Sequence, residues 1–266
     1  MYGIKKKIFL MVMIFFAAML SSCARATVRG AHGVPGVEPF PGPITAVPSE
    51  RGIMIPELPR TNVIHEVAPG ETVWRISKMY DVGIEDIARA NSLKDISRLE
   101  KGERLVIPNA APLMSVIPLY PSNKWKYIIV HHSATEAGNA LSFDYVHSTK
   151  KHWKSLGYHF VIDNGTSGKE DGQIEVSPRW IHQEDGAHCK ASEMNYKAIG
   201  ICLVGNFNES SISPKQMESL VYLVNVLREY YRISYAHILG HGHVRGAVTD
   251  CPGTRFPWRQ FRSRLK

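Results

Sequence analysis

The stretch YIIVHHS, at residues 127–133, decides the fold of the larger part of this chain. Its first four residues are apolar and mostly β-branched or aromatic, which is typical of a buried strand. The strand ends in His131 and His132. A histidine at the end of a central strand is well placed to face a cleft, so we expect chemistry at this end of the sheet.

Strands and helices alternate on the C-terminal side of this stretch. Residues 198–205 form another apolar run, and Ser213, Pro214 and Gln216 provide an N-cap, a first-turn proline and a capping-box glutamine for a long helix. Strands that alternate with helices predict an α/β domain with a mixed central sheet flanked by helices. The other predicted strands are 158–162 and 237–241, and the other predicted helices lie within 143–157 and 257–265.

A small segment on the N-terminal side, residues 63–108, predicts the order strand, helix, helix, strand. Two strands that flank two short helices can cover one small core. Trp74 lies in the first of these helices, and we expect it to pack in that core. The strands are residues 63–67 and 105–107, the first helix follows the N-cap Thr72, and the second spans 84–91.

Proline-rich stretches divide the chain. Residues 23–62 and 109–123 are rich in proline and lack an apolar period, so we expect extended, semi-rigid linkers there. At about 150 residues per domain, a length of 266 residues fits one or two domains. The expected segments are a signal peptide at 1–22, a linker at 23–62, a small domain at 63–108, a linker at 109–123 and a large domain at 124–266.

The N-terminus has the parts of a secretory signal peptide. Lysines at 5–7 precede an apolar run of 13 residues at 8–20, which is short for a membrane span of about 20 residues. The residues LSSC at 20–23 resemble a bacterial lipoprotein box. The resemblance implies a lipidated Cys23 that anchors the protein to a membrane of the cell envelope. Because Ala24 follows, it implies the periplasmic face of the outer membrane in a Gram-negative cell. The alternative is plain secretion with a free or paired Cys23.

Charge and cysteine content exclude several classes of protein. The formal net charge is +8, and it falls to about +5 without the three lysines of the signal peptide. This mild excess fits an acidic cell-wall polymer, and it is too small and too scattered to indicate nucleic acid. Four cysteines in 266 residues exclude a scaffold built on disulfides. Cys189 and Cys202 are either disulfide-bonded or free, and the sequence leaves both states open.

The large domain holds candidate metal ligands. Hydrolytic zinc sites use three protein ligands and leave one position for water. His131 and Cys251 are candidates, and Cys251 lies in the turn TDCPG at 249–253. Either His241 or His243 can supply the third ligand, because both can face the same side of a strand. Spacing does not choose between them.

Three motifs lie in the small segment: PGETVWRI at 69–76, ANSL at 90–93 and GERLVIP at 102–108. Together they resemble a LysM domain over its whole length. LysM domains bind glycans that contain N-acetylglucosamine, such as peptidoglycan and chitin. The resemblance implies a sugar groove formed by residues 70–73 and 92–96.

Six motifs occur in one order in the large domain. Together they resemble the type 2 N-acetylmuramoyl-L-alanine amidases, a superfamily that includes phage amidase lysozymes and animal peptidoglycan recognition proteins. The match covers about residues 124–262. The motifs are IVHHSAT at 129–135, GYHF at 157–160, GAH at 186–188, IGICLVG at 199–205, GH at 240–241 and CPG at 251–253.

The resemblance assigns roles to individual residues. The family's zinc ligands fall on His131, His241 and Cys251, so the resemblance selects His241 over His243. A tyrosine that assists catalysis in many members falls on Tyr158.

Three further residues also receive roles from the resemblance. Thr249 stands where the phage enzymes have lysine and the animal amidases have threonine. Tyr158 and Thr249 are therefore candidates to stabilise negative charge on the substrate carbonyl oxygen. His188 and Asn195 are expected to line the substrate groove. His159, inside an expected strand, is predicted to be a packed histidine.

The sequence thus predicts a zinc-dependent peptidoglycan hydrolase that cleaves the amide between N-acetylmuramic acid and L-alanine of the stem peptide. The alternative is a non-catalytic peptidoglycan-binding envelope lipoprotein. Recognition-only relatives typically lack the cysteine ligand, so the presence of Cys251 favours the enzyme. No carboxylate is an obvious general base. The acidic residues expected to be loop charges are Glu170, Asp171, Glu184 and Asp185.

Overall fold

The computed structural model describes residues 59–266, which belong to one compact unit, Ile55–Lys266. The expected signal peptide, Cys23 and nearly all of the first linker lie outside the described residues. Among the residues that are described, no helix has both the length and the apolar composition that a membrane crossing requires.

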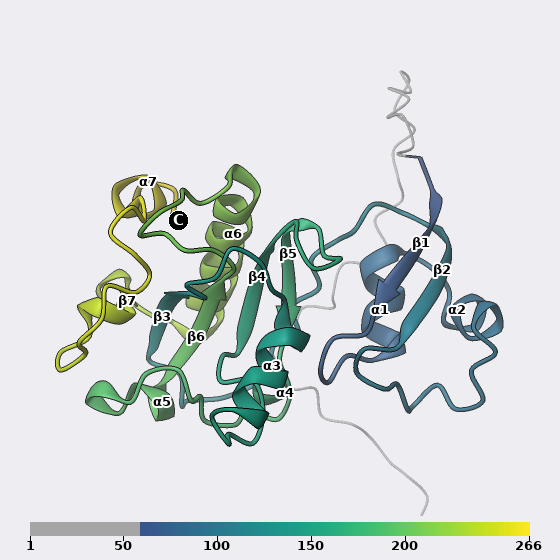
Figure 1. Ribbon diagram of the computed structural model, residues 1–266, viewed down its shortest axis with the longest axis horizontal. Coiled ribbons are helices and arrows are strands. Elements are labelled where there is room, and N and C mark those ends of the chain that lie inside the picture. Colours follow the sequence, from purple (N-terminus) through teal and green to yellow (C-terminus); the bar gives the residue numbers. More distant parts are fainter. Residues whose placement is uncertain (1–58) are drawn as a thin grey trace, which may run out of the picture. The chain divides into compact units, whose positions relative to one another are not determined.

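The small domain has the predicted order strand, helix, helix, strand (Figure 1). β1 (Thr61–Glu66) pairs antiparallel with β2 (Arg104–Ala110), and α1 (Val73–Tyr80) and α2 (Ile84–Ala90) lie between them in the sequence. The Thr72 hydroxyl accepts the backbone N–H of Arg75 at 3.2 Å, as an N-cap does. The predicted fold of this domain is confirmed.

Trp74 does not pack in the small core, so that prediction is wrong. The residue is 53% exposed, whereas Val73, Ile76 and Met79 are buried. These three buried residues recur at helical spacing and form the inward stripe of α1. Trp74 lies beside that stripe and faces outward.

Five strands form the central sheet of the large domain, in the order β5-β4-β6-β3-β7 (Figure 1). β4, β6, β3 and β7 run parallel, and β5 joins the edge antiparallel to β4. The mixed sheet that the sequence predicts is confirmed. The strands are β3 (Tyr127–His132), β4 (Phe160–Asn164), β5 (Asp171–Val176), β6 (Ala198–Leu203) and β7 (Ile238–Gly240).

Helices cover both faces of this sheet. On one face, Leu220 and Val224 of α6 (Pro214–Tyr231) pack in the same core as Val130 of β3. On the other face, Val161 of β4 packs with Ala140 of α3 (Ala140–Thr149). The shorter helices are α4 (Pro178–Ile181), α5 (Met194–Lys197) and α7 (Trp258–Ser263).

The sequence does not predict strand β5, because the buried residues of this strand include polar ones. Asp171 begins the strand, so the expectation that Asp171 is a loop residue is wrong. Gln173 and Glu175 are only 7% and 2% exposed. The Glu175 carboxylate accepts the backbone N–H of Ala140. Buried polar residues leave no apolar period in the sequence, which explains the missed strand.

The second proline-rich stretch, residues 109–123, packs against both domains. Val116 contacts the core of the small domain, and Ile117 contacts the core of the large domain. The indole N–H of Trp180 donates to the carbonyl oxygen of Pro118 at 2.7 Å. The stretch is therefore a fixed connection rather than a free spacer.

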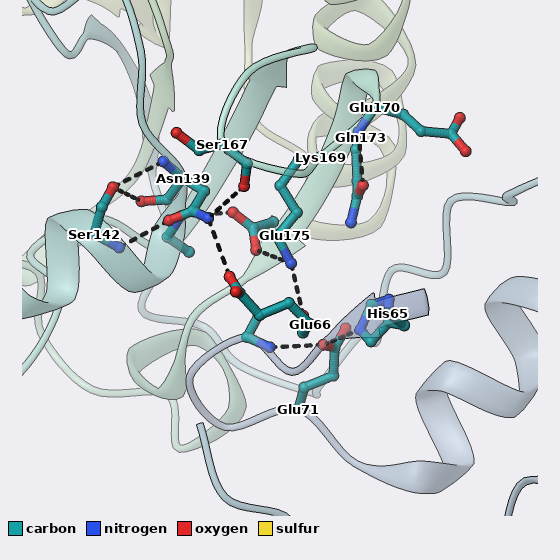
Figure 2. Close-up of polar contacts among 12 residues, drawn as sticks. His65, Glu66, Glu71, Asn139, Ser142, Ser167, Lys169, Glu170, Gln173 and Glu175 are labelled. Carbon is teal, nitrogen blue, oxygen red and sulfur yellow. Dashed lines mark hydrogen bonds and ion pairs between the residues drawn. The ribbon is translucent and has the colours of Figure 1, made fainter. Parts of the chain in front are cut away.

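Polar groups also join the two domains (Figure 2). The Lys169 ammonium donates to the backbone carbonyl of Glu66 at 2.7 Å and lies 3.2 Å from the Glu175 carboxylate. Lys169 and Glu175 come from the large domain, whereas Glu66 ends β1. Lys169 is only 6% exposed. Close by, Arg75 of α1 donates to the carbonyl oxygen of Ile174 at 3.0 Å.

The buried residue Asp163 adds a third ionisable group to the Lys169–Glu175 pair. Burial, reinforced by the negative charge of Glu175, raises the pKa of the Asp163 carboxyl well above its usual range. We therefore expect Asp163 to be protonated at pH 7. Lys169 and Glu175 form the ion pair of this buried cluster.

We expect Lys169→Met to lower the free energy of unfolding by about 3–5 kcal/mol, because it leaves a buried carboxylate without its partner. Chemical denaturation at pH 7 measures the change. Lys154→Met is the matched control, since Lys154 pairs with Glu184 but its side chain is 74% exposed. Exposed pairs contribute little, so the control loss should stay close to the measurement error. Equal losses in the two variants would contradict the assignment of a buried pair.

A second prediction concerns Glu71, whose carboxylate lies 2.7 Å from His65 Nε2. Burial alone would raise the pKa of Glu71, but the hydrogen bond from His65 and the charges of His65 and Arg75 outweigh it and lower the pKa from 4.5 to about 2. A lowered folded-state pKa stabilises the fold fully above the unfolded pKa, and this stabilisation is lost as the pH falls toward the folded pKa.

Glu71→Gln should remove this pH dependence. The difference in unfolding free energy between wild type and variant should shrink by about 3 kcal/mol as the pH falls from about 5 to about 2. Denaturation curves across that pH range measure it. Curves for the two proteins that stay parallel would contradict the lowered pKa.

Candidate metal centre

The register of two parallel strands brings two histidines together. Val130 of β3 is paired with Gly240 of β7. The residue that follows each member of this pair is a histidine, and both histidines lie at the same edge of the sheet. His131 is the next residue in β3, and His241 begins the short 3-10 turn His241–His243 that follows β7.

A loop brings Cys251 to the same place. The backbone N–H of Gly242 donates to the carbonyl oxygen of Cys251 at 2.7 Å, which ties this loop to the turn after β7. The Cys251 Sγ accepts the backbone N–H of His132 at 3.4 Å and lies 3.6 Å from His131 Nδ1. The three candidate ligand atoms of His131, His241 and Cys251 lie within 4.8 Å of one another.

The geometry and the donor types of this cluster fit zinc. Tetrahedral zinc holds nitrogen at about 2.0–2.1 Å and sulfur at about 2.3 Å, which places such a pair of ligand atoms about 3.6 Å apart. The observed distance between Cys251 Sγ and His131 Nδ1 is 3.6 Å. Burial lowers the pKa of His131 well below its usual range and also lowers the pKa of His241, so both imidazoles are neutral, as metal ligands must be.

The structure brings His241, and not His243, close to the other two candidate ligands. The His243 ring lies 5.0 Å from the Trp258 ring, and His243 is exposed. The cluster of candidate ligands contains His241 and not His243.

Tyr158 and Thr249 lie near the cluster. The Tyr158 ring is 5.2 Å from the His131 ring, measured between centroids, and Tyr158 precedes β4 rather than beginning it. Burial raises the pKa of the Tyr158 phenol well above its usual range, and the nearby Cys202 and Cys251 add to this effect. The phenol therefore keeps its proton and can donate. The exposed Thr249 accepts the backbone N–H of Cys251 on its hydroxyl oxygen at 3.2 Å.

His188 and Asn195 both make hydrogen bonds inside the protein. His188 is 8% exposed, and its Nδ1 lies 3.0 Å from His131 Nε2. The Asn195 side-chain oxygen accepts the backbone N–H of Cys189 at 2.7 Å. His188 thus contacts the His131 ring on the Nε2 side. Asn195 stabilises the loop that carries His188. Their expected contact with substrate stays a prediction.

Three other residues flank the centre. His159 is fully buried, as predicted for a packed histidine, and its Nδ1 accepts the backbone N–H of Gly200 at 2.9 Å. Burial lowers the pKa of His159 to about 3. Cys189 and Cys202 are both free thiols in the structure.

The sequence does not reveal one donor to the centre, the backbone N–H of His132. A backbone group has no residue signature, so only the fold can show that it points at Cys251. By contrast, His131, His241 and Cys251 can be identified from sequence motifs.

Comparison with known families divides the chain into two matched regions. Residues 121–254, about half of the chain, match the family model described as N-acetylmuramoyl-L-alanine amidase. Residues 65–108 match the LysM domain model.

Individual relatives align with about half of this chain. Peptidoglycan-recognition protein SC1a of Drosophila melanogaster is 32% identical over 148 residues, which cover 53% of this chain and 74% of that protein. The endolysin of Enterobacteria phage T3 is 30% identical over 125 residues, which cover 44% of this chain and 76% of that protein. Among solved structures, N-acetylmuramoyl-L-alanine amidase LysC from Clostridium intestinale URNW is 30% identical with a TM-score of 0.45, covering 57% of this chain and 96% of that chain.

Proposed function

Since this chain belongs to the N-acetylmuramoyl-L-alanine amidase family and also carries a LysM domain, we propose that it is a zinc-dependent peptidoglycan hydrolase. The bond cleaved is the amide between the lactyl group of N-acetylmuramic acid and L-alanine of the stem peptide. The observation that carries this proposal is the cluster of His131, His241 and Cys251, whose candidate ligand atoms lie within 4.8 Å of one another.

The three residues of the cluster would hold the ion. Bound zinc acts as a Lewis acid and lowers the pKa of water toward about 7. His131 and His241 bind as neutral imidazoles, and Cys251 binds as a thiolate whose charge is stabilised by the His132 N–H.

Two hydroxyl groups, those of Tyr158 and Thr249, would act on the substrate. The amide carbonyl oxygen becomes negative as the bond is attacked, and the Tyr158 phenol donates a hydrogen bond to it. Thr249 supplies a second donor, because its oxygen accepts from the Cys251 N–H and its own O–H stays available. No carboxylate is needed for these roles.

The LysM domain is proposed to bind the glycan strand. Of the two loops expected to form its sugar groove, residues 92–96 include Ile96, which is 50% exposed, and residues 70–73 include the exposed Thr72. Peptidoglycan contains both the glycan and the stem peptide. One polymer therefore supplies a ligand to the LysM domain and a substrate to the amidase domain.

A non-catalytic peptidoglycan-binding protein is the alternative, and the relatives include proteins named for peptidoglycan recognition. A complete set of candidate ligands favours the enzyme, because recognition alone does not require two histidines and a thiol whose ligand atoms lie within 4.8 Å of one another.

Digestion of purified sacculi tests the proposal, with Cys251→Ser as the decisive variant. We expect the wild type to bind about one zinc per chain and to release free stem peptides that begin with L-alanine, identified by mass spectrometry. A serine hydroxyl is a poor replacement for a thiolate. Cys251→Ser should therefore lose zinc and at least about 100-fold of the activity, while it keeps its fold.

Cys189→Ser is the matched control for this variant, because it also removes a buried free thiol but lies outside the ligand cluster. The control should keep zinc and activity. A wild type that binds zinc but releases no stem peptide would support the binding-only alternative. A Cys251→Ser variant that keeps both zinc and activity would remove Cys251 from the ligand set.

We also propose that the protein is anchored in the cell envelope through a lipid on Cys23, which lies outside the described residues. The support is the sequence LSSC at 20–23 after an apolar run. Cells fed labelled palmitate should label the wild type and Cys189→Ser, but not Cys23→Ser. Equal labelling of all three proteins would exclude this anchor.

A further inference from the structure

The residue behind the metal ligand His131 is another histidine, His188. Its Nδ1 lies 3.0 Å from His131 Nε2, and its Nε2 lies 3.3 Å from the backbone carbonyl oxygen of Ala198. Both ring nitrogens of His188 therefore have partners in the protein. His131 and His188 are 2% and 8% exposed, so water does not compete strongly for these contacts.

The carbonyl oxygen of Ala198 determines which ring nitrogens of His188 and His131 carry a hydrogen. A carbonyl oxygen can only accept, so His188 Nε2 carries a hydrogen and donates it to Ala198. A neutral imidazole has one such hydrogen, so His188 Nδ1 is an acceptor. His131 must then carry its own hydrogen on Nε2 and donate it to His188.

This assignment determines the state of the other ring nitrogen of His131, Nδ1. With the hydrogen on Nε2, the lone pair of His131 lies on Nδ1, the atom 3.6 Å from Cys251 Sγ. The opposite tautomer would place a hydrogen on Nδ1 and block the position where a metal must bind. The contacts thus select the one tautomer of His131 that can coordinate.

Two glycines leave the space that the His188 ring occupies. A Cβ atom added at Gly200 would lie 2.4 Å from His188 Cδ2, and one added at Gly186 would lie 2.3 Å from the same atom. A side chain at either position would therefore displace the ring. Gly200 is in β6, opposite Ile129 of β3, so the space for the ring is part of the central sheet.

Strand pairing also fixes the position of Ala198, whose carbonyl oxygen accepts from His188. Ala198 begins β6 and is paired with Tyr127 of β3, the strand that carries His131. The acceptor and the metal ligand are thus held by neighbouring strands of one sheet. Their separation does not depend on a surface loop.

We propose that His188 is a positioning residue that sets the tautomer and ring orientation of His131 through a relay ending on the Ala198 carbonyl. This inference rests on the proposed zinc site, and it gives His188 a role that needs no contact with substrate. Loss of an outer partner of this kind typically weakens metal binding by about 10- to 100-fold.

Two substitutions at His188 separate the hydrogen bond from the volume of the ring. His188→Leu fills similar space but offers no acceptor to His131. His188→Asn keeps an acceptor oxygen near the position of Nδ1. We expect the zinc dissociation constant, measured by competition with a chromophoric chelator, to rise about 10- to 100-fold for leucine and no more than about threefold for asparagine. His237→Asn, which removes a histidine remote from the cluster, should match the wild type.

Visible spectra of the cobalt-substituted proteins provide a second readout. The bands report the ligand geometry, so they should shift for leucine and stay close to those of the wild type for asparagine. A purely structural role would affect both variants according to their loss of stability. Equal weakening of zinc binding by leucine and asparagine, or no weakening by leucine, would overturn the proposal.

The tautomer itself is measurable without metal. Nitrogen-15 NMR of the metal-free wild type should show His131 protonated on Nε2 and His188 also protonated on Nε2. A proton on His131 Nδ1 would overturn the relay, whatever the zinc content of the protein and even if His188→Leu does not fold. Failure of the wild type to bind zinc, with the expected tautomers present, would instead count against the proposed function alone.

Discussion

The parallel pairing of β3 with both of its neighbours is the constraint on which the site depends. Pairing with β7 places Val130 opposite Gly240, so His131 and His241 follow side by side. Pairing with β6 places Gly200 opposite Ile129 and opens the space for the His188 ring. Backbone hydrogen bonds along whole strands set this register. The sheet therefore determines the positions of both candidate histidine ligands, and a loop has to supply only Cys251.

Much of this arrangement can be predicted from the sequence. The run at 127–130 predicts the central strand, and the capping residues around Ser213 predict the long helix, whose N-cap hydroxyl accepts the Gln216 N–H at 3.0 Å. The candidate metal cluster of His131, His241 and Cys251 can also be predicted, because the family resemblance of the motifs around these residues selects His241 over His243. What cannot be predicted depends on contacts between distant parts of the chain. The sequence does not predict strand β5, because Glu175 of this strand pairs with Lys169 inside the protein. A glutamate in a sequence does not show that it has a buried partner.

The junction between the two domains illustrates the same limit. Prolines at 109–123 predict an extended linker, but the contacts of this stretch depend on where Val116 and Ile117 find apolar partners. Arg75 lies in a motif of the LysM domain, yet its guanidinium donates to Ile174, which is 99 residues away. A buried charge is costly unless it is paired or hydrogen-bonded. Separating the two domains would break these contacts, so they hold the small domain against the large domain more strongly than a flexible linker would.

The electrostatics of the centre also decide what kind of site the Cys251 and His131 pair can be. A cysteine nucleophile needs a lowered thiol pKa, usually beside a protonated histidine. Here burial raises the pKa of Cys251 to about 12, and burial lowers the pKa of His131 well below its usual range. Both shifts oppose a thiolate–imidazolium pair. A metal cation needs neutral imidazoles and compensates a buried thiolate, so the same environment that disfavours a nucleophilic cysteine favours a metal ligand.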